Sequence, residues 1–90
     1  MKYHVAHILV AHKYTADDVL RKIKDGKDFG ELARVNSSCP SGERGGDLGP
    51  LLPGRADPDF EEAALELKVG EISQTPVRTK FGYHLIKRLA

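Results

Sequence analysis

Two segments at opposite ends of the chain carry the apolar, β-branched and aromatic residues that are typical of β-strands. They span residues 3–10 and 81–89. In the first segment, apolar side chains fall at odd and at even positions, so both faces of this strand are expected to be covered. If both strands are central in one sheet, the two ends of the chain lie side by side.

Between these strands, apolar residues recur at helical spacing in three places. Each stretch follows a residue that can cap a helix N-terminus: Thr15, Asp28 and Asp57. Gly26 is expected to end the first helix by taking a left-handed conformation, and Lys68 with Gly70 is expected to close the third. The pattern therefore predicts three main helices.

The segment 37–54 has turn-forming residues at nearly every position. A short strand is expected at 48–51, with Pro50 at a sheet edge or a bulge. Residues 71–79 are expected to be short and extended. The element order β, helices, β, helix, β, β predicts an α+β fold on a mostly antiparallel sheet.

Composition narrows the class of protein. Fourteen Lys and Arg face 13 Asp and Glu in 90 residues, a formal net charge of +1, which argues against a nucleic-acid partner or a membrane surface. The apolar runs are too short for a membrane span or a signal peptide, and one cysteine cannot form an internal disulfide. We expect a single soluble, cytoplasmic domain over residues 1–90.

Four residues could carry chemistry: His7 and His84 in the terminal strands, and Cys39 and Asp47 in the glycine-rich segment. If the two strands are neighbours, the histidines meet in the core, where buried imidazoles need hydrogen-bond partners. Such a pair either braces the sheet or serves a site, and the spacing alone leaves both open. Asp47, between glycines, is most simply a turn-former whose carboxylate accepts from nearby backbone N–H groups.

The residue spacing gives little or no support to metal binding, to nucleophilic catalysis by cysteine, or to phosphate binding by the glycines. A metal site is not expected, because His4 and His7 point to opposite faces of a strand and Cys39 stands alone. Nucleophilic catalysis by Cys39 lacks a clear helix N-terminus behind the thiol, since residues 40–42 are expected to begin a turn. The glycines of 42–46 have neither the Walker nor the dinucleotide-binding spacing.

Five blocks in the same order along the chain resemble the parvulin family, and specifically its small, single-domain bacterial or archaeal type. The blocks are HILV (7–10), CPSGERGGDLG (39–49), FEEAA (60–64), VGEIS (69–73) and FGYHLIK (81–87). Parvulins are peptidyl-prolyl cis-trans isomerases. The resemblance implies an FKBP-like fold, with a four-stranded antiparallel sheet surrounded by about four helices, in a monomer without a cofactor or metal.

The resemblance also assigns catalytic positions. His7 and His84 match the paired histidines of the parvulin site. Cys39 stands where the family has a cysteine or an aspartate, and Thr79 where a threonine or serine joins the histidine network.

The residues implied for substrate binding are Leu48, Leu51, Ala56, Phe60 and Phe81. Leu48 and Phe60 match two walls of the pocket for the substrate proline ring. Ala56 stands where the family usually has methionine or leucine, and Leu51 where an aromatic residue is frequent, so the apolar rim is thinner here.

The implied activity is isomerisation of X-Pro bonds during protein folding by a non-covalent mechanism, on proline-containing peptides or unfolded protein clients. The segment 11–14 is short and has no arginine cluster, so dependence on phosphorylation is not expected. Because of Ala56, an alternative stays open: a parvulin scaffold with weakened catalysis that acts as a peptide-binding module or holdase.

Overall fold

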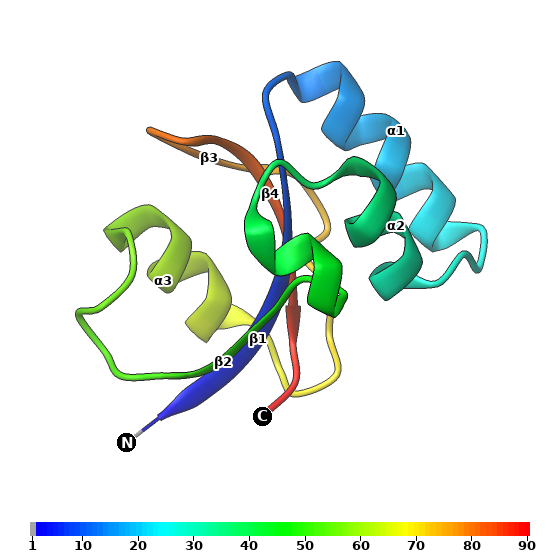
Figure 1. Cartoon of the computed structure of the whole chain (residues 1–90). Coiled ribbons are helices and arrows are strands. Elements are labelled where there is room, and N and C mark those ends of the chain that lie inside the picture. Colours follow the sequence, from blue (N-terminus) through cyan, green and yellow to red (C-terminus); the bar gives the residue numbers. More distant parts are fainter. Residues whose placement is uncertain (1) are drawn as a thin grey trace.

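The computed structural model describes residues 2–90 and contains four strands and three α-helices, with one short 3-10 helix (Figure 1). In chain order these are β1 (Tyr3–Val10), α1 (Lys13–Lys24), α2 (Phe29–Asn36), η1 (Pro40–Arg44), β2 (Asp47–Leu51), α3 (Pro58–Glu66), β3 (Val77–Thr79) and β4 (Gly82–Arg88). The α+β order predicted from the sequence is confirmed, and the helices number about four when η1 is included.

The four strands form one antiparallel sheet in the order β2-β1-β4-β3. The two terminal strands therefore occupy its centre, as predicted, and β2 with Pro50 lies at an edge. In the register between β1 and β4, His7 pairs with Ile86 and Leu9 with His84. The two histidines are thus diagonal neighbours on the same face of the sheet.

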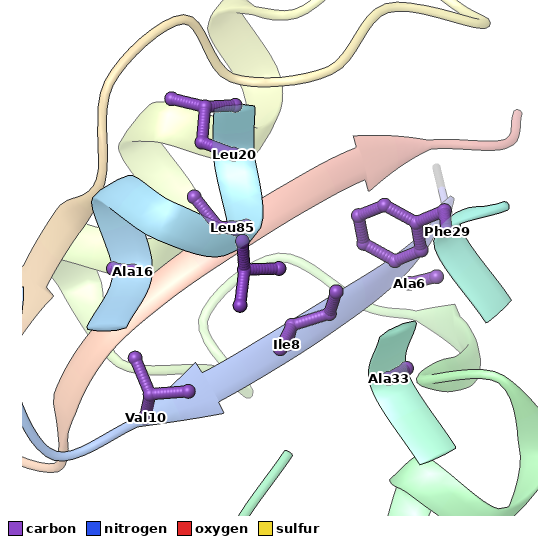
Figure 2. Packing of buried hydrophobic residues seen from close by; sticks show 9 residues of the cluster. Ala6, Ile8, Val10, Ala16, Leu20, Phe29, Ala33 and Leu85 are labelled. Carbon is purple, nitrogen blue, oxygen red and sulfur yellow. The ribbon is translucent and has the colours of Figure 1, made fainter. Parts of the chain in front are cut away.

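Helices cover the sheet on both faces: α3 lies on one side, and α1 with α2 on the other (Figure 1). Under α1 and α2, alternate residues of the central strands meet apolar helix side chains in the larger hydrophobic core (Figure 2). Its buried members are Ala6, Ile8, Val10, Ala16, Val19, Leu20, Phe29, Ala33 and Leu85.

The opposite face carries a smaller apolar cluster under α3, made of Tyr3, Val5, Phe60, Ala64 and Ile86. Because side chains alternate along a strand, the two clusters use neighbouring residues of the same strands. The described residues form no helix that is long and apolar enough to cross a bilayer.

Two helix ends differ from the sequence-based expectation. The first helix does not begin at Thr15: α1 starts at Lys13, and its N-cap is His12, whose side chain makes no capping hydrogen bond. The third helix stops at Glu66 rather than at Lys68 and Gly70, because Leu67 leaves the helix in an extended conformation and packs against the cluster under α3. At the end of α3, tertiary packing thus outweighs the local signal.

The other predicted helix signals are confirmed. The Asp28 carboxylate accepts from the Glu31 N–H at the start of α2, and the Asp57 carboxylate accepts from two N–H groups at the start of α3. Gly26 follows α1 with φ +98°. Residues 40–42, expected to begin a turn, belong instead to η1, for which Cys39 is the N-cap.

Candidate active site

The two strand histidines meet as predicted. Nδ1 of His7 lies 2.9 Å from Nδ1 of His84, and Nε2 of His84 lies 2.7 Å from the Thr79 hydroxyl. That hydroxyl also accepts the Phe81 N–H at 3.1 Å. All three side chains are buried, with 4–7% of each residue exposed. A hydrogen-bonded chain therefore runs from the β3–β4 turn to the centre of β1.

Burial keeps both imidazoles uncharged. Loss of hydration, with a smaller contribution from the neighbouring His84, lowers the pKa of His7 to about 4. Loss of hydration also lowers the pKa of His84 to about 4, against a smaller opposing effect of the Asp57 carboxylate. In a neutral pair one Nδ1 donates and the other accepts. Among residues 2–90, Nε2 of His7 has no hydrogen-bond partner.

These histidines form the inner wall of an apolar pocket of about 260 Å³. The lining residues come from β1, the glycine-rich segment, α3 and the β3–β4 turn: His7, Leu9, Cys39, Leu48, Ala56, Asp57, Phe60, Phe81 and His84. The ring of Phe60 meets both imidazoles edge to face, with centroids 5.5 Å from His7 and 5.1 Å from His84. This packing holds the two imidazoles in place.

The glycine-rich segment is held tightly against β1. Gly46 has φ +83°, its carbonyl accepts the His7 N–H at 2.9 Å, and a Cβ at this position would lie 2.2 Å from the His7 carbonyl oxygen. Only glycine fits there without displacing the strand. The segment thus fixes the backbone of a pocket histidine.

Leu48 reaches the pocket through an irregularity of β2. The pairing of β1 with β2 shifts register between His4 and Ala6, and Gly49 has φ +71°. The Asp47 carboxylate accepts the Gly49 N–H at 2.8 Å and pairs with the His4 ring. This confirms Asp47 as a turn-former, and bulges of this kind re-aim side chains beside active sites.

Cys39 lines the pocket and is partly buried. Its Sγ accepts the hydroxyl of Ser41 at 3.2 Å, and its N–H donates to the Ser37 hydroxyl. The sulfur therefore has a hydroxyl donor as its neighbour, and no side chain that could serve as a base hydrogen-bonds it within the described part of the chain.

Of the nine residues predicted for the site, seven line the pocket. Thr79 acts through its hydrogen bond to His84, and Leu51 packs instead against the cluster under α3. The sequence analysis did not assign Leu9 and Asp57 to the site, although both line it. Leu9 shares a strand face with His7, and Asp57 follows Ala56, so position along the chain could have indicated both.

Within residues 2–90, no group of three or more His, Cys, Asp and Glu side chains is placed to hold a metal ion. His4 and His7, which the alternation of the strand separates, lie in different surroundings: His4 faces Asp47, while His7 faces His84. The arrangement that the structure does present is a small apolar pocket with uncharged polar groups on one wall.

The sequence of this chain matches a known domain family and several known proteins. Residues 7–90 match the family model for the rotamase PPIC-type PPIase domain. The foldase protein PrsA of Geobacillus kaustophilus is 49% identical over 87 residues, which is 96% of this chain and 31% of that protein. The chain thus spans about a third of the length of the curated relatives it matches.

Solved structures of related proteins share the fold of this chain. A crystal structure of PrsA from Bacillus anthracis superposes with a TM-score of 0.94 at 42% identity, covering 97% of this chain and 40% of that one. NmPin, described as the parvulin of Nitrosopumilus maritimus, gives a TM-score of 0.86 at 40% identity, covering 99% and 96% of the two chains. The resemblance found in the sequence is confirmed: this chain belongs to the parvulin, or PPIC-type, family of peptidyl-prolyl cis-trans isomerases.

Proposed function

We propose that this domain accelerates cis-trans isomerisation of X-Pro bonds in peptides and unfolded proteins, without a covalent intermediate. The observation that carries this proposal is the apolar pocket whose inner wall is formed by two uncharged histidines. The membership of the chain in an isomerase family, and the name foldase borne by its PrsA relatives, support the same activity.

The reaction explains why such a pocket suffices. An X-Pro bond isomerises over a barrier of roughly 20 kcal/mol, because twisting the amide breaks its resonance. No bond to the enzyme is needed, so the enzyme has only to bind the twisted amide better than either planar form. Planar amides carry separated charge, whereas the twisted amide carries less. Apolar surroundings therefore disfavour the planar ground states relative to the transition state.

The residues that line the pocket have different roles in the isomerisation. Leu48 and Phe60 grip the proline ring from β2 and α3. His7 and His84 supply polarity without charge, because a charged imidazolium would stabilise the planar, charge-separated amide. His7 Nε2 is buried and has no hydrogen-bond partner within residues 2–90. The Nδ1 contact with His84, which in turn hydrogen-bonds Thr79, orients the His7 ring.

Cys39 contributes local polarity rather than a nucleophile. Its sulfur accepts a hydroxyl hydrogen bond from Ser41, which leaves the thiol group without the basic partner that nucleophilic catalysis requires. Cys39→Ser is therefore expected to keep isomerase activity, and no thioester with substrate should be trapped in the parent protein.

The alternative is a peptide-binding module or holdase with weakened catalysis. The observation that favours it is Ala56, whose single methyl group lines the pocket where the family usually places a longer side chain. We favour the isomerase, because the hydrogen-bonded chain of His7, His84 and Thr79 is complete. A site that had lost its catalytic role would have no need to keep three buried polar side chains aligned.

The deciding experiment is exchange NMR on Ala-Xaa-Pro-Phe peptides. We expect cis-trans exchange well above the uncatalysed rate, and a loss of at least tenfold in kcat/KM for His84→Leu, with amide spectra confirming that the variant folds. Exchange at the uncatalysed rate, together with peptide-induced shifts at Leu48 and Phe60, would instead establish a binding module.

Three finer statements belong to the same proposal. Independence of phosphorylation is supported by the start of α1 at Lys13, which leaves only Ala11 and His12 between β1 and the helix. The cytoplasmic location stays a prediction from composition, and the monomeric state stays a prediction from the resemblance to parvulins. Proline-containing peptides and unfolded clients are the partners that the pocket chemistry favours.

A further inference from the structure

We propose that a cationic groove beside the pocket selects peptides with an aspartate or glutamate close to the proline. This inference rests on the proposed isomerase activity and adds a substrate class to it. The groove has a volume of about 440 Å³ and lies between the start of α1 and the β3–β4 turn.

The charges on this groove have one sign. Its lining includes Lys13, Arg78 and Lys80 but no carboxylate. Arg78 and Lys80 are exposed, while Val77 and Thr79, which alternate with them, turn inward. Within residues 2–90, no carboxylate lies within ion-pair distance of Arg78 or Lys80. Both cations are therefore free to meet an anionic side chain of a peptide.

Lys13 is the exception, because its Nζ lies 2.9 Å from the Asp17 carboxylate, one helical turn further along α1. This pair is exposed, with 65% of the Lys13 side chain accessible, and exposed pairs of this kind contribute little. We therefore expect Arg78 and Lys80 to dominate and Lys13 to add a smaller attraction.

The groove adjoins the pocket at Phe81. Phe81 lines both hollows, and the Lys80 ammonium lies 5.3 Å from the centroid of the Phe81 ring. Thr79, which hydrogen-bonds His84 on the pocket side, also lines the groove. An extended peptide advances about 3.3 Å per residue, so a side chain within about three residues of a bound proline can reach the cations.

Acidic side chains lie on the α3 side of the pocket. Asp57 lines the pocket itself, and Asp59 and Glu61 follow in the first turn of α3. The groove that Arg78 and Lys80 line has no carboxylate, so an acidic peptide side chain is favoured there over the α3 side. The whole chain has a net charge of only +1, which makes the separation a local property of this site.

The test compares three series of peptides that carry glutamate, alanine or lysine at each of three positions before and after the proline. At low salt we expect a gain in kcat/KM of about two- to fivefold for glutamate over alanine, from exposed charge pairs. The gain should occur on one side of the proline only and should fall at high salt. Equal gains on both sides would indicate attraction to net charge alone and would overturn the groove.

A charge reversal sharpens the test. Lys80→Glu should abolish the preference for glutamate, because the new carboxylate offsets Arg78, and the double variant Arg78→Glu with Lys80→Glu should invert the preference, so that lysine peptides become better than glutamate peptides. The matched control is Lys27→Glu, which changes an exposed lysine between α1 and α2, away from the groove, and should keep the parental preference. An unchanged glutamate-to-lysine ratio in Lys80→Glu would refute the proposal.

Two further arms separate this inference from related possibilities. The alanine peptides test isomerase activity by themselves: if they are turned over without any charge preference, the groove fails while the proposed function stands. A phosphoserine peptide tests the anion. A gain more than tenfold above that of glutamate would assign the groove to phosphate and overturn the assignment to a carboxylate.

Discussion

The two faces of the sheet are built from the same two central strands, yet they differ in chemistry. Under α1 and α2, Ile8 and Leu85 are fully buried among apolar side chains. One residue away along each strand, His7 and His84 bring imidazoles into an apolar pocket on the α3 side. The first face supplies stability, while the second gives up apolar contact for polar groups that act on a substrate.

This contrast shows how a domain of 90 residues can hold a buried polar site. Small domains bury little surface, and their stability margin is narrow. Here the two buried imidazoles lie on one face, where hydrogen bonds join them to each other and to Thr79, and the other face carries a large cluster of buried hydrophobic residues. Substitutions on the two faces should therefore have separable effects.

The largest expected effect is on the apolar face. Leu85→Ala should lower the free energy of unfolding by about 3 kcal/mol, because it removes fully buried methyl groups and leaves a cavity. Urea unfolding measures this loss.

Two further variants test whether the faces are separable. The milder Leu85→Val should keep kcat/KM per folded molecule within twofold, whereas Phe60→Ala should reduce both stability and kcat/KM. A tenfold loss of activity in Leu85→Val would show that the two faces are not separable.

The next effect concerns pH and belongs to the histidine face. The unfolded chain binds protons on His7 and His84 near pH 6.5, whereas the folded protein does so only near pH 4. Stability is therefore fully present above about pH 6.5 and is lost as the pH falls toward 4. Between pH 7 and pH 5 the loss should be about 2 kcal/mol for each histidine.

Denaturation in urea at both pH values measures this loss. The double variant His7→Leu with His84→Leu should show a much smaller dependence, while His12→Gln, which changes an exposed histidine at the start of α1, should behave like the parent. If the double variant kept the full pH dependence, the buried pair would not be its source.

The smallest expected effect is on kcat/KM and comes from filling the pocket wall at Ala56. Ala56→Met should raise kcat/KM about three- to tenfold, because added apolar atoms can contact the proline ring, at roughly 0.8 kcal/mol per buried methylene. The control is Arg55→Met, which adds the same side chain at an exposed neighbouring position outside the lining. Equal activity in Ala56→Met and the parent would mean that this wall does not limit the reaction.

The strands and the histidine pair could be predicted from sequence because their signals are local or follow from one topological assumption. Alternation in β1 and β4 fixes which residues share a face, and central positions for both strands bring His7 to His84. The resemblance to parvulins then indicated seven of the residues that line the pocket.

The rest depends on packing that no local pattern encodes. The close approach of Gly46 to His7, and the bulge that directs Leu48 inward, arise only when the glycine-rich segment folds back onto β1. The end of α3 is set by where Leu67 finds apolar neighbours. The resemblance implies that Leu51 lies at the pocket rim, but this side chain packs against the cluster under α3.

The central position of both terminal strands also determines when the site can exist. His7 and His84 are 77 residues apart, so closing this loop costs about 4 kcal/mol in chain entropy before any contact between them forms. Pairing at such long separation slows folding, and the sheet has no centre until β4 is available. During synthesis, this proposed catalyst of slow folding steps would therefore complete its own site only when nearly all of the domain has emerged.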